Sequence, residues 1–177
     1  MYQSVLDAIK ARRSVRAFTD QPIARAELEK LVEAGRWAPT GKDRQSFRFT
    51  VLTDREKIQD LARAVAPHFA WTKGKNYNFY DPVALILVSD ERENTNGLAD
   101  CSCALQNIFL MASELGIGSC WINQLKYICD EEDIRPRLDA LRIPGDHIVW
   151  GMAALGYPAK PVPAEGAPRK SEVVYID

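Results

Sequence analysis

Residues 98–115, LADCSCALQNIFLMASEL, carry apolar side chains on nearly every side of an expected helix. A helix with this pattern must be buried all round. Complete burial of such a long helix is hard to arrange within one small domain, so the segment favours a packed homodimer. Gly116 suits the position just after the last helical residue.

Shorter elements flank this helix on both sides. Strands are expected at 47–52, 83–88, 119–122 and 147–155, and the run at 83–88 has the apolar, β-branched composition of a strand buried on both faces. Amphipathic helices are expected after Ser4, after Pro22 and after Thr53 or Asp54, with a weaker one near 134–141. This alternation predicts an α/β or α+β layered domain.

Length, net charge and the N-terminal sequence indicate the number of domains, the kind of partner and the cellular location. The 177 residues suffice for one core and are few for two, so we expect a single domain over residues 1–177. A net charge of -1 gives no broad attraction for nucleic acid. Residues 1–18 carry charges and lack a continuous apolar run, so we expect no signal peptide, no membrane span and a cytoplasmic location.

Side chains for direct catalysis are scarce. The four cysteines lack the CxxC pairs that hold zinc, so they are interpreted as buried thiols and no metal site is expected. Neither of the two histidines lies beside a serine or cysteine turn, so no nucleophilic triad is predicted and no side chain is assigned as catalytic acid or base. Chemistry carried by a cofactor fits this composition better.

Two polar segments are candidates for binding. RRSVR at 12–16 places three guanidinium groups and a hydroxyl at a helix end, which suits a phosphate, although cations also favour a helix C-terminus as ordinary solvated groups. The loop APTGKDRQ at 38–45 offers donors and acceptors for a flat heterocycle, with an ordinary polar connection as the alternative. The GxG at 116–118 precedes a strand, the reverse of the dinucleotide fingerprint.

Two further segments have special compositions. Residues 68–80 mix aromatic side chains with glycine, lysine and asparagine without periodicity, as in a lid or an ordered loop. The proline-rich stretch 158–168 is expected to be extended, and 172–176 has strand composition. Because this last strand has no obvious local partner, it could add to the sheet of a second subunit.

The ordered set of motifs resembles the nitroreductase family of FMN flavoproteins over almost the whole chain. RRSVR at 12–16 is similar to the family's phosphate-binding segment, and APTGKDRQSF at 38–47 to its Ala-Pro-Ser-x-x-Asn-x-Gln-Pro-Trp loop. ALQN at 104–107 with ELGIGSCWI at 114–122 resembles the dimer-interface helix and the strand behind the flavin, and LGYPA at 155–159 the closing strand and turn. The resemblance implies an α+β sandwich with a central, mainly antiparallel sheet flanked by helices, in an intertwined homodimer with C-terminal strand exchange.

The resemblance also implies which residues hold FMN at the subunit interface. The phosphate and ribityl end would be held by Arg12, Arg13 and Ser14, with Arg16 and Arg169 as further candidates. The loop that lines the flavin from the other subunit would contribute Pro39, Thr40, Lys42, Asp43 and Gln45. Near the ring would lie Trp121, Ile122 and Asn123. Aromatic candidates for stacking on nicotinamide or on an acceptor are Phe69, Trp71, Tyr77 and Phe79, with core packing as the alternative.

Three positions depart from the family loop: Asp43 replaces the usual Asn, Ser46 the usual Pro and Phe47 the usual Trp. An ionised Asp43 cannot donate a hydrogen bond, and near the ring it would disfavour an anionic reduced flavin. The implied activity is a ping-pong transfer of hydride from NAD(P)H through FMN to a nitroaromatic, quinone or similar acceptor. The alternatives are an FMN-binding module without general reductase activity, a specialised flavin enzyme of the same superfamily, and a dimeric interaction protein without a ligand.

Overall fold

The computed structural model describes residues 3–163 and 166–177 and is built around one antiparallel sheet. Its strands are β1 (Arg48–Leu52), β2 (Ala84–Glu91), β3 (Gly118–Ile122) and β4 (His147–Gly156). They lie in the order β1-β2-β4-β3, and each neighbouring pair is antiparallel. All four expected strands are therefore present in one sheet.

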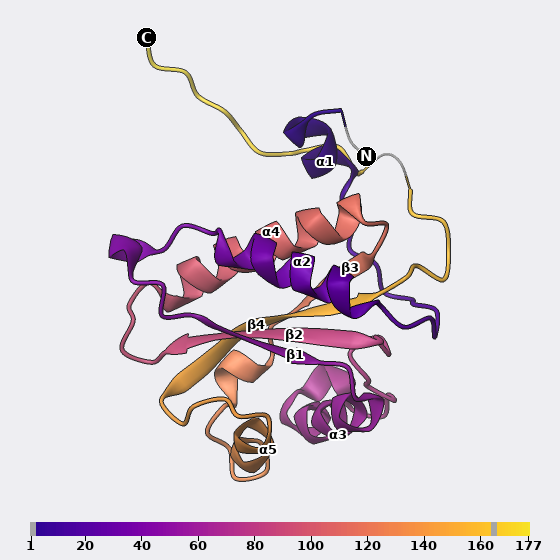
Figure 1. Ribbon diagram of the computed structural model, residues 1–177, viewed down its shortest axis with the longest axis vertical. Helices are drawn as coiled ribbons and strands as arrows, with labels where there is room; N and C mark the ends of the chain where they lie inside the picture. The colour runs from indigo at the N-terminus through magenta and orange to yellow at the C-terminus, as the bar shows by residue number, and fades with distance from the viewer. Residues whose placement is uncertain (1–2, 164–165) are drawn as a thin grey trace.

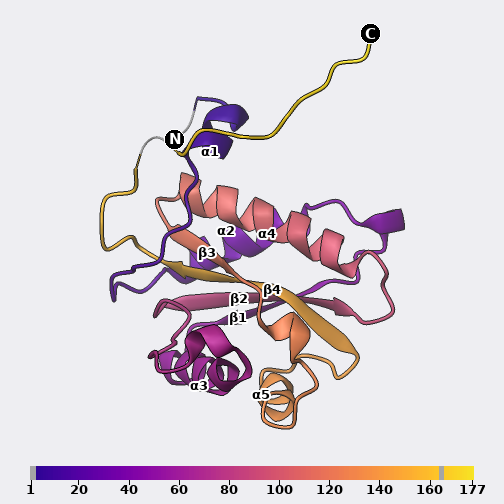
Figure 2. The same cartoon turned by 180° about the vertical axis from the view of Figure 1, so that it is seen from behind.

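Helices cover both faces of this sheet, as Figures 1 and 2 show. One face carries α2 (Arg25–Arg36) and α4 (Gly97–Glu114), and the other carries α3 (Arg55–Val65) and the short α5 (Arg135–Ala140). The alternation of side chains along a strand divides β2 between two cores: Leu85 and Leu87 pack with the α3 cluster, whereas Ile86 and Val88 pack with the α2 and α4 cluster. Burial on both faces explains why this strand is apolar throughout.

The single chain does not bury α4 all round, contrary to what its composition suggests. Ala104, Leu105 and Ile108 are fully buried, but Leu98 is 44% exposed and Cys103 is also exposed. The remaining open side agrees with a helix that packs against a second copy, which one chain cannot test.

The first helix, α1 (Val5–Ala11), stands at the edge of the body beside the C-terminal half of α4 (Figure 1). Ser4 caps it, because the Ser4 hydroxyl accepts the Asp7 N–H at 3.1 Å. Val5, Leu6 and Ile9 form an apolar stripe on α1 that remains exposed in the described chain. An uncovered apolar stripe of this kind is typical of a contact surface.

Two further segments complete the description. Residues 68–80 form an ordered loop, one of the two forms expected: it starts at the end of the 3-10 turn η2 (Ala66–His68), contains the 3-10 turn η3 (Ala70–Thr72) and packs on the α3 side of the sheet. Residues 172–176 form no strand within the described chain, and the tail extends away from the body past α1 (Figures 1 and 2). None of the helices in these described ranges is long and apolar enough to cross a membrane.

Candidate functional site

The RRSVR segment is held against the edge of β3 and is not a freely solvated helix end. Ser14 forms a parallel bridge with Ser119, and the Val15 N–H donates to the Ser119 carbonyl at 2.9 Å. Gly118 makes this approach possible, because a Cβ there would lie 2.9 Å from the Val15 side chain. The backbone that carries the predicted phosphate ligands is therefore fixed by the sheet.

Ser14 and Arg12 open into a small cavity of about 120 Å³. Its lining residues come from three elements, the RRSVR segment, α4 and β3: Arg12, Ser14, Gln106, Phe109, Ser119 and Trp121. The cavity thus combines one guanidinium with hydroxyl and amide groups and an aromatic wall. This set can hold a compact anion next to an apolar group.

The other two arginines of the segment have local partners. Arg13 donates to the backbone carbonyl of Arg12 at 2.8 Å, and Gly166 of the tail lies against its guanidinium group. Arg16 lies over the Tyr80 ring at 5.8 Å from the centroid. Arg12 is accordingly the arginine of this segment that lines the small cavity.

Between Ser119 and Trp121 of β3, the buried thiol of Cys120 belongs to the core on the α3 side of the sheet. Burial raises the pKa of Cys120, while the positive charges of Arg16 and Arg12 partly oppose this shift. A thiol with a raised pKa is a weak nucleophile. Cys120 therefore serves packing. The prediction of buried thiols holds for Cys101, Cys120 and Cys129 but is wrong for Cys103, which is exposed on α4 in the single chain.

The second candidate segment, the loop at 38–47, has an unusual backbone. Lys42, Asp43 and Gln45 all have positive φ angles, of 57°, 54° and 50°. The Thr40 hydroxyl accepts the Gln45 N–H at 3.1 Å, and the Gln45 side-chain amide donates to the Asp43 carboxylate at 2.6 Å. Left-handed conformations at non-glycine residues are costly and concentrate at functional sites.

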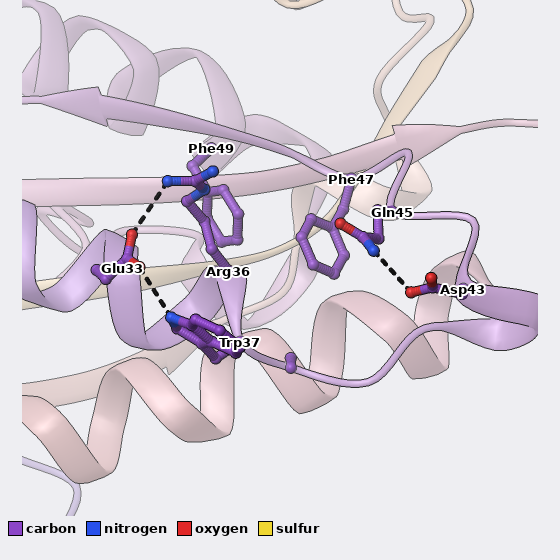
Figure 3. Close-up of a pocket in the computed structure, with 8 residues that line it drawn as sticks. Glu33, Arg36, Trp37, Asp43, Gln45, Phe47 and Phe49 are labelled. Atoms are coloured by element: carbon purple, nitrogen blue, oxygen red, sulfur yellow. Dashed lines mark hydrogen bonds and ion pairs between the residues drawn. The ribbon is translucent and has the colours of Figure 1, made fainter.

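This loop forms one wall of a groove of about 620 Å³ (Figure 3). The opposite wall is the end of α2, where the Trp37 indole donates to Glu33 at 2.8 Å and Arg36 pairs with the same carboxylate at 3.0 Å. Trp37 is 80% exposed. Phe47 and Phe49 add an edge-to-face aromatic pair. The groove offers aromatic surfaces beside polar groups, as a planar heterocycle requires.

The groove and the small cavity are separate in one chain. The loop contacts the first turn of α4, where the Gly41 N–H donates to Asp100, whereas the RRSVR segment lies beside Gln106 and Phe109 farther along the helix. Within residues 3–163 and 166–177 the two linings share no residue. One chain therefore presents two separate candidate binding surfaces.

The predicted aromatic stacking residues lie elsewhere. Phe79 is 0% exposed and belongs to the core on the α3 side, with Tyr77 and Phe69 packed against the same cluster. Burial also raises the pKa of Tyr77 above its ordinary value. Trp71 is exposed and packs edge-on against Tyr77 at 5.1 Å. Phe79 has no free surface for a ligand, so its role in this chain is core packing, the alternative that the sequence left open.

The other predicted residues are divided between core and surface. Trp121 lines the small cavity, with its ring 6.0 Å from that of Phe109, but Ile122 is buried in the core. Asn123 follows the strand at the surface, and Arg169 lies in the exposed tail. Pro39 and Lys42 are exposed in the loop.

Several lining residues were not predicted from the sequence. Gln106 and Phe109 share one face of α4 by their spacing of three, a signal that core residues also give. Glu33, Arg36 and Trp37 close the groove from the end of α2, and no motif marked them as binding residues. Their role depends on where α2 ends relative to β1, which only the folded chain shows.

Comparison with known proteins identifies the family to which this fold belongs. The sequence profile of the Nitroreductase family matches residues 9–157. The chain belongs to this family. A crystal structure of a nitroreductase with bound FMN from Bacteroides fragilis matches with a TM-score of 0.89 and 36% identity over 99% of both chains. The predicted family and the α+β fold with an antiparallel sheet are thus confirmed.

Relatives known by sequence are named as flavin or nicotinamide oxidoreductases. A protein of Methanothermobacter thermautotrophicus, provisionally named NADH dehydrogenase/NAD(P)H nitroreductase, is 35% identical over 159 residues, covering 88% of this chain and 78% of its own length. The FMN reductase (NADPH) of Bacillus subtilis is 27% identical over 174 residues, covering 88% of this chain and 66% of that protein.

Proposed function

We propose that this nitroreductase-family protein is an FMN-dependent oxidoreductase that takes hydride from NAD(P)H and reduces an electron-poor acceptor such as a quinone or a nitroaromatic. The observation that carries the proposal is the small cavity at β3, where Arg12 and Ser14 meet the Trp121 ring. A cationic fork and a hydroxyl suit a phosphate monoester, and the indole suits the organic part of the same molecule. The FMN-bound Bacteroides fragilis nitroreductase supports this choice of ligand.

The residues fit FMN only if two chains combine. The small cavity, of about 120 Å³, can take a phosphate but not a tricyclic ring, whereas the groove of about 620 Å³ can take the ring. We propose a homodimer in which the phosphate end lies at Arg12 and Ser14 of one subunit and the loop at 38–47 of its partner lines the ring.

Exposed apolar surface supports the dimer. The stripe on α1 and the apolar tail residues 173–176 lack a cover in the described chain. In the same description β1 pairs with β2 alone, so its outer edge is open to a further strand. We propose that residues 172–176 of one subunit add to this edge of the other.

The protein's part in catalysis is positioning. When bound, FMN supplies the group that accepts hydride and passes electrons on. Arg12 and Ser14 anchor the phosphate end, Trp121 packs against the organic part, and Thr40 with Gln45 offers hydrogen bonds from the loop. No side chain of the site is assigned a proton-transfer step, and the donor and acceptor use the site in turn.

The test begins with the purified protein. Released FMN near one per subunit, identified after denaturation, and steady NAD(P)H oxidation with a quinone or nitro compound support the proposal. Arg12→Ala should weaken FMN binding, whereas Arg25→Ala, which removes an exposed arginine of α2 paired with Glu29, should not. Bound FMN without turnover of any such acceptor would favour the module without reductase activity. A protein that neither contains nor takes up FMN would refute the proposal.

A further inference from the structure

The loop at 38–47 is tied to α4 by a buried carboxylate. Asp100 is 5% exposed, and its Oδ1 accepts the Gly41 N–H at 2.9 Å. Gly41 leaves no room between loop and helix, because a Cβ there would lie 2.3 Å from the Asn96 side-chain nitrogen. The loop thus rests directly on the first turn of α4.

A buried hydrogen-bond network holds Asp100 in this position. The Asn94 side-chain amide donates to Asp100 Oδ2 at 3.2 Å and to Asp90 Oδ2 at 2.8 Å. The Asn94 Oδ1 in turn accepts the Asn96 N–H at 3.0 Å. Turning the Asn94 amide over would lose all of these bonds, so the network specifies one arrangement of Asp100.

The loop needs such an anchor because its own backbone is strained. Lys42, Asp43 and Gln45 hold left-handed conformations that persist only where the surroundings enforce them. The two bonds that Gln45 donates, to the Thr40 hydroxyl and to the Asp43 carboxylate, lie within the loop. The bond from Gly41 to Asp100 instead links the loop to a helix of the main body.

We propose that Asp100 is a positioning residue for flavin binding. It acts through Gly41, so that Thr40, Asp43 and Gln45 present their polar groups in one arrangement to the ring. The inference rests on the proposed function, which assigns this loop to FMN. Because its carboxylate is buried behind the loop, Asp100 itself does not touch the ligand.

Two variants separate the anchor from a general effect on folding. Asp100→Asn keeps the shape of the side chain but replaces one acceptor oxygen by an NH2 donor. In one orientation this NH2 group faces the Gly41 N–H, and in the other it faces the Asn94 amide, so one of the two hydrogen bonds is always lost. Asp100→Ala removes the anchor altogether. Ile58→Val is the matched control, because Ile58 is fully buried in the α3 core on the opposite face of the sheet.

The experiment has a readout with flavin and one without it. Hydrogen exchange of the segment 38–47 in flavin-free protein should be faster in both Asp100 variants and unchanged in Ile58→Val. The FMN dissociation constant should rise roughly tenfold in Asp100→Asn and further in Asp100→Ala. The visible circular dichroism of bound FMN should change in both variants, because the ring meets a loop of different shape.

Other outcomes would overturn either the role of Asp100 or the proposed function. Wild-type affinity and an unchanged visible spectrum in Asp100→Ala would overturn the inference, as would equal weakening in Ile58→Val. Unchanged exchange of the segment 38–47 would also overturn it. If the wild-type protein itself bound no FMN, the proposed function would fail and the flavin role of Asp100 with it, whereas the exchange data would still show whether Asp100 anchors the loop.

Discussion

Gly118→Ala tests whether the contact between β3 and the RRSVR segment positions the phosphate ligands. A Cβ at 118 would lie 2.9 Å from Cβ of Val15 and 2.9–3.0 Å from its two methyl carbons. Carbon atoms in good contact are about 3.5–4.0 Å apart, so Val15 must withdraw by roughly 0.5–1 Å. Overpacking of this kind costs about 1–3 kcal/mol. In a chain of this size, the melting temperature should fall by roughly 2–12 °C.

The same displacement reaches the ligand groups. Moving Val15 stretches the 2.9 Å bond from its N–H to Ser119 and shifts Ser14 in the cavity. We expect the FMN dissociation constant to rise at least tenfold, which corresponds to about 1.4 kcal/mol. Thermal melts of the flavin-free protein and a titration of FMN fluorescence measure the two effects separately.

Controls identify the clash as the cause. Gly145→Ala should change neither quantity, because a Cβ at 145 meets nothing within 4 Å. Val15→Gly should rescue Gly118→Ala, whereas Val15→Ala should rescue it only in part, since its Cβ still lies 2.9 Å from the new methyl group. Normal stability and FMN affinity in Gly118→Ala, or failure of Val15→Gly to restore affinity, would refute the reasoning.

Three further predictions concern the aromatic segment, the loop and the tail. Phe79→Ala should destabilise the protein by about 3–5 kcal/mol in denaturant titrations, because Phe79 lies in the core. The KM of the remaining folded enzyme should not change. A raised KM at unchanged stability would instead show that Phe79 contacts the ligand. Asp43→Asn should raise the potential of bound FMN by about 20–30 mV, or ~1 kcal/mol for two electrons, because the proposed site puts this carboxylate near the ring and the change removes its negative charge. An unchanged potential in a spectroscopic redox titration would place the carboxylate away from the ring. Deleting residues 172–177 should shift the protein towards monomers in sedimentation experiments, and an unchanged dimer would exclude the tail as a main contact.

The sequence was most informative where packing is local and periodic. The strand at 83–88 could be predicted because both of its faces are buried, which demands apolar side chains at every position. The cap at Ser4 could be predicted, and the cap at Asp54 could be narrowed to Thr53 or Asp54, because a short polar side chain serves the free N–H groups of the next turn. The strand order β1-β2-β4-β3 could not, because it depends on contacts between distant segments.

The candidate site shows the same division. Arg12 and Ser14 could be proposed as phosphate ligands because a dense cluster of phosphate-binding groups is visible in the sequence, and both line the small cavity. Asp100 was not, since one carboxylate in the first turn of an apolar helix looks like a response to the helix dipole. The choice between ligand contact and core packing for Phe79 could not be made, because an aperiodic aromatic segment does not reveal which ring points into the core.

The proposed division of the site between two chains leads to a prediction that no single variant can supply. In the symmetric dimer proposed above, each site would take its phosphate ligands from one subunit and its loop from the other. Consider a mixed dimer of an Arg12→Ala chain and a Thr40→Ala/Gln45→Ala chain, each of which loses FMN as a homodimer. If the site is shared, one site of the mixed dimer carries both defects and the other site carries neither.

The shared arrangement therefore predicts one FMN per mixed dimer, bound with wild-type affinity. If one chain made the whole site, each site of the mixed dimer would carry one defect and neither would bind FMN normally. Co-expression with two different affinity tags isolates the mixed species, and its flavin content at saturation gives the answer. The result would show whether both subunits contribute residues to each site or whether they only pack together. Two defective chains can rebuild one intact site only if both contribute.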